Sequence, residues 1–378
     1  MIYKPFGNTG IEMSALGFGA MRLPMEGKQV NTDLATEMIR KAVELGVNYV
    51  DTAPYYCEHD SERAVGIALK PIRDKVYLST KSPVADKNPA AFRQKLEASL
   101  KKLDTDHVDF YHFWGINLAT FEGAIDVPGG LYEAALKAKE EGLIRHISFS
   151  FHDKAENMRP IVDSGLFESV LCQYNLLDRA NEAEIAHATK RGLGVVIMGP
   201  VGGGRLGAPS EVIRGLLGHK VQSSAEMALR FVLANPNVNI ALSGMSDMSQ
   251  LIENNKVASI GGELTAEEIS QVNEMMEENK RLAELYCTGC RYCMPCPQGI
   301  NIPKVFEVMN LHRVYKLTKF ATEEYARLAV PINERTDWEQ ANGVQADACV
   351  ECGHCEAECP QKLQIISQLK ESHKTLTS

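Results

Sequence analysis

The amino-acid sequence predicts an α/β fold in which eight parallel strands alternate with helices in a closed barrel, followed by a small, mainly helical domain. Residues 1–275 alternate between short apolar runs, typical of buried parallel strands, and longer segments with apolar residues at helical intervals. The remaining residues differ in composition, because eight of the ten cysteines lie after residue 286. We therefore expect two domains, 1–275 and 276–378.

The apolar runs place the strands of the barrel in order. Helical patterns separate them, for example in residues 34–46, 90–103 and 130–142. An open doubly wound sheet is the alternative, but it should carry a G-x-G-x-x-G turn after its first strand, and the sequence GFGAMR at 17–22 does not match. The barrel is therefore favoured, with its chemistry at the carboxyl ends of the strands. The expected strands are Ala15–Gly19, Val47–Asp51, Val76–Thr80, Val108–Phe113, Ile144–Phe149, Ser169–Gln173, Gly194–Met198 and Val238–Leu242.

Composition excludes several classes of protein. The chain has 378 residues, of which 44% are hydrophobic and 24% charged, as in ordinary globular proteins. The net charge of −9 argues against binding to the phosphates of nucleic acid. No apolar run is long enough to span a bilayer, and the start, MIYKPFGNTG, lacks the pattern of a secretory signal. We expect a cytoplasmic protein with no nucleic-acid or membrane partner.

The eight clustered cysteines form two groups of the same design. Each group has three cysteines separated by two residues, then a fourth cysteine directly before a proline. This pattern matches the bacterial ferredoxin run, whose last thiolate binds the other cluster. We predict two 4Fe-4S clusters, one held by Cys287, Cys290, Cys293 and Cys359, the other by Cys349, Cys352, Cys355 and Cys296.

Two alternatives exist for these cysteines. Zinc sites also use Cys-x-x-Cys pairs, but two pairs complete one ion, so the third spacing and the prolines would have no use. Disulfides are typical of small secreted domains. His354, inside the second group, is not expected to be a ligand. Residues 280–378 resemble the α-helical ferredoxin domains of respiratory iron–sulfur subunits, which implies a ferredoxin-like domain with a helical spacer and a loop near 333–342.

Candidate catalytic residues lie at the ends of the second and third predicted strands. They read Asp51-Thr-Ala-Pro-Tyr-Tyr56 and VYLSTK, which ends in Lys81. Together with LGFGAMRL, SERAVGIAL, IRHISFS, LCQYNLLDR, GPVGGGRL and SGMSDMSQLIENN, in this order, they make the barrel similar to an aldo-keto reductase. The resemblance implies a TIM barrel and an NAD(P)H-dependent oxidoreductase of a small carbonyl or alcohol substrate. Tyr56 would be the general acid, Lys81 would lower its pKa from about 10, and Asp51 would hold Lys81.

The fourth strand departs from the family pattern. The family usually has a histidine where this chain has Trp114, while His112 lies two residues earlier on the same face of the strand. His112 could reach the site and take a catalytic role, or it could be a core residue. Trp114 would form an apolar wall, so polarisation of the carbonyl by an imidazole is in doubt.

The resemblance also implies a dinucleotide lying across the strand ends. Glycines let backbone approach a pyrophosphate, and helix N-termini favour anions. The choice between NADP and NAD as the cofactor remains open, because neither Gly244 nor Gln250 offers the cation that NADP-selective members use. His152, after the fifth strand, lies near a family asparagine, but we do not expect it to contact the cofactor. The expected contacts are Gly19, Ala20, Met21, Ser150, Gln173, Gly199, Pro200, Val201, Gly202, Ser243, Gly244, Met245, Ser246, Gln250 and Asn254.

Two functions fit these features. The first is a carbonyl oxidoreductase whose clusters are structural or transfer electrons. The second is an electron-transfer or partner-docking protein, with a redox partner protein, whose barrel has weakened catalysis. A nicotinamide delivers two electrons as hydride whereas a cluster accepts one, and the sequence shows no flavin signature that would join the two.

Overall fold

The computed structural model describes residues 1–84, 87–207, 209–217, 221–260, 264–284, 287, 291–330, 344–359 and 362–378. They form two compact units. The first comprises Met1–Gly203 and Ala228–Leu264, and the second comprises Gly204–Met227 and Thr265–Ser378. Residues 204–227 thus group with the C-terminal segment, which the sequence did not indicate. The division at 275/276 stays a prediction.

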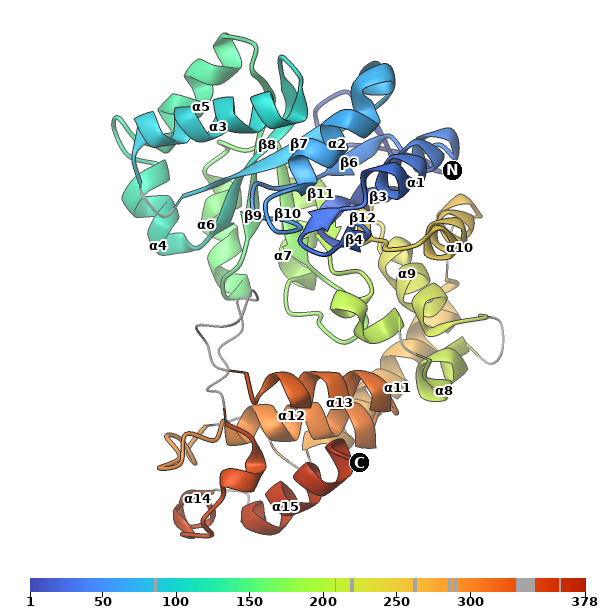
Figure 1. Ribbon diagram of the computed structural model, residues 1–378, viewed down its shortest axis with the longest axis vertical. Helices are drawn as coiled ribbons and strands as arrows, with labels where there is room; N and C mark the ends of the chain where they lie inside the picture. The colour runs from blue at the N-terminus through green and yellow to red at the C-terminus, as the bar shows by residue number, and fades with distance from the viewer. Residues whose placement is uncertain are drawn as a thin grey trace. The chain divides into compact units, whose positions relative to one another are not determined.

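The first unit contains a closed barrel of eight parallel strands (Figure 1). Around the barrel the order is β10, β11, β12, β3, β6, β7, β8 and β9. Each predicted strand overlaps one of these, so the predicted barrel is confirmed. The strands are β3 (Leu16–Gly19), β6 (Tyr49–Asp51), β7 (Tyr77–Pro83), β8 (Val108–Ile116), β9 (Ile144–Phe151), β10 (Ser169–Gln173), β11 (Gly194–Met198) and β12 (Ile240–Gly244).

Helices enclose these strands, as α3, α5 and α6 show in Figure 1. Asparagine side chains cap two of them: Leu34 N donates to Asn31 Oδ1 at the start of α1, and Ala90 N donates to Asn88 Oδ1 at the start of α3. Two short hairpins, β1 (Tyr3–Pro5) with β2 (Glu12–Ser14) and β4 (Met25–Glu26) with β5 (Gln29–Val30), precede α1. The helices are α1 (Thr32–Glu44), α2 (Ser61–Leu69), α3 (Pro89–Leu103), α4 (Leu118–Thr120), α5 (Leu131–Glu140), α6 (Met158–Asp163), α7 (Glu182–Lys190), α9 (Ser224–Ala234) and α10 (Met248–Ser259).

Apolar side chains fill the amino end of the barrel. Phe6, between β1 and β2, is fully buried and meets Phe110 edge-on, with ring centroids 5.3 Å apart. A Cβ on Gly194 would lie 2.5 Å from the Phe6 ring, so β11 needs glycine there. This packed base leaves the opposite, carboxyl end of the strands for the site. The buried cluster comprises Phe6, Met13, Tyr49, Phe110, Leu171, Val196, Ile240 and Leu242.

A bulge interrupts the pairing of β8 with β9. Phe113 pairs with Phe149 and Ile116 pairs with Phe151, so two residues of β8, Trp114 and Gly115, face one residue of β9. Gly115 has φ +66°, a conformation that glycine adopts without strain. Bulges change the direction of side chains at strand ends. Here the extra residue lies at the carboxyl end of β8.

The second unit is mainly helical. Thr265 and Glu268 form a reciprocal capping box at the start of α11. Helices α12 and α13 pack against one another, and α15 contacts both, which confirms the predicted helical spacer. Ser210, just before α8, donates a hydrogen bond to the carbonyl of Tyr315 (2.5 Å). The helices are α8 (Glu211–Arg214), α11 (Ala266–Glu284), α12 (Ile302–Arg313), α13 (Thr318–Arg327), α14 (His354–Glu358) and α15 (Ile365–Leu376).

The loop expected near 333–342 lies outside the described residues. Among the helices that the structure describes, none combines the length and apolar character that crossing a bilayer requires.

Candidate active site and cluster site

Asp51 and Lys81 form a buried ion pair at the carboxyl ends of β6 and β7. Lys81 Nζ donates to Asp51 Oδ2 at 2.5 Å and to the Thr52 carbonyl at 2.9 Å. Ser79 Oγ donates to the other carboxylate oxygen at 2.7 Å. The side chains of Lys81 and Asp51 are 1% and 3% exposed. A buried pair is tolerated when both charges are fully bonded, as here, so this pair fixes the position of the ammonium.

Tyr56 lies next to that ammonium. Lys81 Nζ is 4.7 Å from the centroid of the Tyr56 ring. Burial raises the pKa of Tyr56, and the opposing effect of Lys81 does not cancel it. Burial alone would lower the pKa of Lys81, but Asp51 and Tyr56 outweigh it, so the pKa of Lys81 is raised. The phenol is therefore protonated and the lysine charged at neutral pH, which suits proton donation rather than proton removal.

Aromatic rings form a wall beside Tyr56. Trp114 meets Tyr56 edge-on, with centroids 5.8 Å apart and planes at 82°. Tyr55, which is 46% exposed, lies 5.4 Å from Trp114 and 5.2 Å from the ring of His59. This wall is apolar and partly open, so it can hold the apolar part of a substrate near the phenol.

His112 lies deeper in the barrel. It pairs with Lys81 across β7 and β8, is fully buried, and places Nε2 3.2 Å from the hydroxyl of Tyr49. Burial and the charge of Lys81 lower the pKa of His112 to about 3. A catalytic role for His112 stays a prediction, and a fully buried neutral imidazole can act only through Lys81 or Tyr49.

The predicted dinucleotide contacts gather at one end of the barrel, because all eight strands run parallel. Gly19 ends β3, and Ala20 and Met21 follow it. Ser150 is the last residue but one of β9, and Gln173 ends β10. The contacts from 199 to 202 follow β11, Ser243 and Gly244 end β12, and Met245 and Ser246 follow β12. A Cβ on Gly199, whose φ is +62°, would lie 2.7 Å from Gln173 Oε1. Asn254 Nδ2 donates to Ser243 Oγ at 3.1 Å in a buried contact, and Gln250 accepts from Ser246 N at 3.0 Å.

Arg22 is a functional candidate that the sequence analysis missed. Its guanidinium donates to the Gly203 carbonyl at 2.8 Å, and its aliphatic stem lies where a Cβ on Gly244 would be, with contacts from 3.4 Å. Arg22 therefore offers a cation between the two glycine-rich loops. The available signal was its place directly after the predicted contacts Gly19, Ala20 and Met21. An exposed guanidinium between these loops fits a phosphate group.

The N-terminus of α10 is already occupied. Asp247 Oδ1 accepts from Gln250 N at 2.9 Å, and hydrogen bonds from Ser249 and Gln250 lower the pKa of Asp247. This carboxylate uses the helix N-terminus that an anion would otherwise bind. Backbone of the loops and Arg22 are therefore better placed to meet a phosphate than α10 is.

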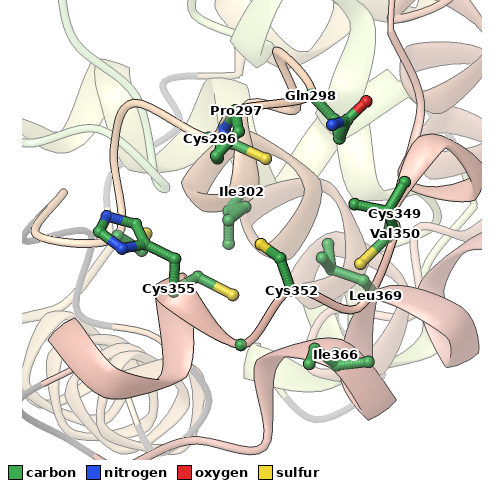
Figure 2. Close-up of a pocket in the computed structure, with 13 residues that line it drawn as sticks. Cys296, Pro297, Gln298, Ile302, Cys349, Val350, Cys352, Cys355, Ile366 and Leu369 are labelled. Atoms are coloured by element: carbon green, nitrogen blue, oxygen red, sulfur yellow. The ribbon is translucent and has the colours of Figure 1, made fainter.

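One pocket of the second unit collects cysteines from both groups (Figure 2). Cys296, next to Pro297 and Gln298, faces the sulfurs of Cys349, Cys352 and Cys355, with Ile302, Ile366 and Leu369 around them. Cys293 and His354 also line this pocket. The fourth cysteine of the first group thus lies with three cysteines of the second, as the predicted exchange of last thiolates requires. An array of thiols in one concave site fits an iron–sulfur cluster.

The backbone around these cysteines turns in the left-handed region. Arg291, Glu351 and Gly353 have φ of +65°, +57° and +77°. Such residues let a short loop curl around a centre. None of the described cysteines forms a disulfide. Burial raises the pKa of Cys355, and the charges of Glu356 and of the neighbouring cysteines raise it further.

The remaining predicted ligands are placed in part. Cys287 is half-buried, and Cys293 and Cys359 are buried. Cys290 lies outside the described residues. The ligand set of the first cluster, which includes Cys290 and Cys359, therefore stays a prediction.

Tyr325 of α13 supports the second cysteine group. The Tyr325 hydroxyl accepts from Ala346 N at 3.0 Å and lies 3.0 Å from His373 Nδ1, while Gln345 Nε2 donates to the Tyr325 carbonyl at 2.8 Å. Tyr325 is fully buried. The segment that leads into Cys349 is thereby tied to α13 and α15.

Known proteins share both parts of this architecture. Residues 15–277 match the Aldo/keto reductase family, and residues 286–364 match the 4Fe-4S dicluster domain. An aldo-keto reductase from Mycobacterium sp. (strain MCS) is 30% identical over 277 residues, which cover 71% of this chain and 89% of that protein. L-galactose dehydrogenase from Arabidopsis thaliana is 28% identical over 309 residues, 74% of this chain and 95% of that protein.

Solved structures agree with this relationship. The holo form of aldo-keto reductase AKR11C1 from Bacillus halodurans superposes with a TM-score of 0.63 at 28% identity, covering 73% of this chain and 96% of that chain. The match to the family spans most of the barrel, and the cysteine groups lie within the second match. This chain therefore belongs to the aldo/keto reductase family of oxidoreductases and carries a 4Fe-4S dicluster domain after its barrel.

Proposed function

We propose that this chain is an NAD(P)H-dependent oxidoreductase that reduces a small carbonyl compound to an alcohol, with Tyr56 as the proton donor. The observation that carries the proposal is the buried Asp51–Lys81 pair beneath the Tyr56 ring. L-galactose dehydrogenase, a relative by sequence, is named for the reverse direction on a sugar. The shared chemistry is the interconversion of a carbonyl and an alcohol.

Each residue of the candidate active site has a separate role in the proposed reduction. A reduced nicotinamide, when bound across the strand ends, would supply the hydride to the carbonyl carbon. Tyr56 gives its phenolic proton to the carbonyl oxygen, and the charge of Lys81 stabilises the phenolate that remains. Asp51 keeps Lys81 charged and in place. Trp114 and Tyr55 hold the apolar part of the substrate and exclude water on that side.

The dinucleotide would bind across the strand ends. Glycine-rich backbone at 199–203 and at Gly244 allows close approach, and Arg22 supplies a cation for a phosphate. We propose NADP or NAD as the cofactor, since the cation is present but is not at the positions that usually select NADP.

The two clusters are proposed to bind Cys287, Cys290, Cys293 and Cys359, and Cys349, Cys352, Cys355 and Cys296. They serve a structural or electron-transfer role. Trp114 stands where the family resemblance implies a histidine, and it supports a second proposal: an electron-transfer or partner-docking protein with a redox partner and a slowed barrel site.

One experiment separates these functions. Protein purified without oxygen is assayed for iron, sulfide and zinc, then for NADPH and NADH oxidation with an activated aldehyde such as 4-nitrobenzaldehyde. Tyr56→Phe should lower kcat by about 10²- to 10⁴-fold without weakening dinucleotide binding. Tyr77→Phe, on β7 at the opposite end of the barrel, is the control. Dinucleotide binding without turnover in the unaltered protein would favour the second function.

A further inference from the structure

Ser61 is the first residue of α2, and its side chain bonds to the ends of two neighbouring strands. Gly19 and Asp51 pair across β3 and β6, and the residues that follow them are Ala20 and Thr52. The Ser61 hydroxyl donates to the Ala20 carbonyl at 2.8 Å and lies 2.8 Å from the Thr52 hydroxyl. Ser61, Ala20 and Thr52 are all fully buried. Ser61 therefore joins the ends of β3 and β6 in a place that water does not reach.

The chemistry of these groups fixes the direction of the two hydrogen bonds. A carbonyl only accepts, and a serine hydroxyl has one proton, so Ser61 gives that proton to Ala20. Thr52 must then donate its own proton to Ser61 Oγ. Because the groups are buried, removing the Ser61 hydroxyl leaves both the Ala20 carbonyl and the Thr52 hydroxyl without this partner, which is costly.

Thr52 connects these hydrogen bonds to the Lys81 ammonium. The Thr52 carbonyl accepts from Lys81 Nζ at 2.9 Å, and the Thr52 backbone N–H donates to the Ser79 carbonyl at 2.9 Å. With its hydroxyl held by Ser61, Thr52 has a partner for each of its polar groups. The carbonyl that Lys81 uses as its second acceptor is therefore fixed in position.

Ser61 also closes the loop that carries Tyr56. The Ser61 backbone N–H donates to the Tyr56 carbonyl at 3.2 Å. Between them, Cys57, Glu58 and His59 have φ of +51°, +53° and +69°, in the left-handed region that residues with a side chain adopt only at a cost. Such a turn persists when contacts around it hold it, and the hydrogen bond from Ser61 to Tyr56 spans this one.

Ala20 begins the 3-10 turn Ala20–Arg22, which contains predicted dinucleotide contacts and the Arg22 guanidinium. Arg22 donates to the Gly203 carbonyl at 2.8 Å, in the glycine-rich loop after β11. Cys57 Sγ lies 3.5 Å from the Met21 carbonyl, which is a second contact between the Tyr56 loop and this turn. Ser61 thus holds the start of a turn whose end reaches the proposed phosphate site.

We propose that Ser61 is a positioning residue whose hydroxyl fixes the dinucleotide turn Ala20–Arg22 against Thr52, the residue whose carbonyl holds Lys81. This inference rests on the proposed carbonyl reduction. Ser61 transfers no proton to the substrate, because that proton comes from Tyr56. Its role is to keep the bound dinucleotide and the proton donor at a constant separation, since a small displacement of reacting groups lowers a rate by up to about 10²-fold.

The test measures dinucleotide affinity and turnover separately, in the cluster-loaded protein with 4-nitrobenzaldehyde as substrate. Ser61→Ala should raise the Kd for NADPH about fivefold and lower kcat about tenfold, because it releases both the turn and Thr52. Thr52→Val keeps the shape of threonine without its hydroxyl and should lower kcat more than it raises the Kd. Thr52→Ser keeps the hydroxyl and should lose less of kcat than Thr52→Val. If Ser61→Ala does not fold, the two Thr52 variants decide.

Ser169→Ala is the matched control. The Ser169 hydroxyl is also fully buried and bonds to another hydroxyl, that of Ser148 at 2.6 Å, but Ser169 lies at the start of β10. Its removal should lower the stability of the barrel and leave kcat and the Kd for NADPH within twofold. A similar loss of stability in Ser169→Ala and Ser61→Ala, with kinetic losses only in Ser61→Ala, supports positioning.

A combined variant tests the connection to the dinucleotide turn. In the Arg22→Gln protein, Ser61→Ala should raise the Kd for NADPH at most about twofold, compared with about fivefold in the unaltered protein, because Ser61 acts through the turn that carries Arg22. Ser169→Ala, which affects packing alone, should change the Kd equally in the two proteins. An equal effect of Ser61→Ala in both would reject the connection.

Two further results would overturn the inference. One is a kcat and a Kd for Ser61→Ala that both stay within twofold of the unaltered protein, and the other is an equal loss of kcat in Thr52→Val and Thr52→Ser. If NADPH binds without turnover, the proposed reduction fails and the Kd values still decide the role of Ser61. If Tyr56→Phe loses activity while Ser61→Ala keeps both constants, the reduction stands and this inference fails. Absence of NADPH and NADH binding would reject both.

Discussion

The edge of Trp114 packs against the ring of Tyr56, with centroids 5.8 Å apart. Contacts of this kind contribute about 0.5–1.5 kcal/mol and prefer a defined geometry. Trp114 therefore restricts the orientation of the phenol that is proposed to donate the proton. Trp114 thus supports Tyr56 through the contact between their rings.

Removing this ring should loosen Tyr56. We expect Trp114→Ala to lower kcat/KM for aldehyde reduction about three- to tenfold, while Trp114→Phe keeps most of it. Steady-state kinetics of the two variants measure the difference. If Trp114→Phe lowers kcat/KM as much as Trp114→Ala does, the loss comes from the indole N–H and not from the ring contact.

The raised pKa of Tyr56 predicts opposite pH profiles for the two directions. Reduction needs the protonated phenol, so its rate should be level through neutral pH and fall only above the ordinary tyrosine pKa of about 10. Alcohol oxidation needs the phenolate and should rise with pH over the whole range. A reduction profile that already falls below about pH 8 would contradict a raised pKa.

Arg22 should contribute to dinucleotide affinity. Loss of a charged hydrogen bond costs about 1.5–3 kcal/mol, so Arg22→Gln should raise the Kd for NADPH at least about tenfold. Arg145→Gln, at the amino end of β9, is the control, and fluorescence titration gives the Kd values. Comparing ADP with 2′,5′-ADP identifies the phosphate, since a partner of the 2′-phosphate affects only the second ligand. Unchanged affinity for all these ligands would remove Arg22 from the site.

The pocket that Cys296 shares with the second cysteine group predicts which cluster a Cys296 variant would lose. Cys296→Ser should remove the cluster of the second cysteine group and lower iron from about eight to about four atoms per chain. Cys57→Ser, in the barrel, should leave the iron content unchanged. Iron analysis and the visible absorption of anaerobically purified protein test both. Full iron content in Cys296→Ser would mean that this thiolate binds no cluster.

Glu168 should stabilise the barrel against acid. Burial alone would raise its pKa, but His146 and Lys139, whose nitrogens lie 2.7 and 2.6 Å from its oxygens, lower it to about 2. The stabilisation is present above the unfolded pKa of about 4.3 and is lost as the pH falls towards 2. Because the carboxylate is 32% exposed, we expect only about 1 kcal/mol.

The matched variant is Glu168→Gln. Urea unfolding followed by circular dichroism should show the variant less stable at pH 6, with the difference shrinking between about pH 4.5 and 2.5. A difference that stays constant over this range would assign the effect to packing and not to charge.

The strands were predictable because each is buried on both faces and reads as a short apolar run. All eight lie within a few residues of the expected positions. The bulge at Trp114 and Gly115 was not predictable, since register depends on the partner strand and not on local sequence.

The candidate site was predictable where motif and geometry coincide. Asp51 ends β6, and Lys81 lies near the end of the neighbouring strand β7, so parallel pairing brings them together. Arg22 was missed because its partners, Gly203 and Gly244, are about 180 and 220 residues away and contribute backbone rather than side chains. The cysteine pattern predicted that Cys296 lies with the second cysteine group, because in bacterial ferredoxins the last cysteine of each run binds the other cluster. The role of Cys296 as a ligand stays a prediction.

Residues 204–227 have a practical consequence for dissecting the protein. The chain leaves the first unit after Gly203, returns within α9, and leaves again after Leu264. A truncation near residue 275 would leave residues 204–227, which belong to the second unit, attached to the barrel. Ser210 would then lose its hydrogen bond to Tyr315. A barrel produced alone by truncation would therefore keep residues 204–227 without the partners that they have in the second unit.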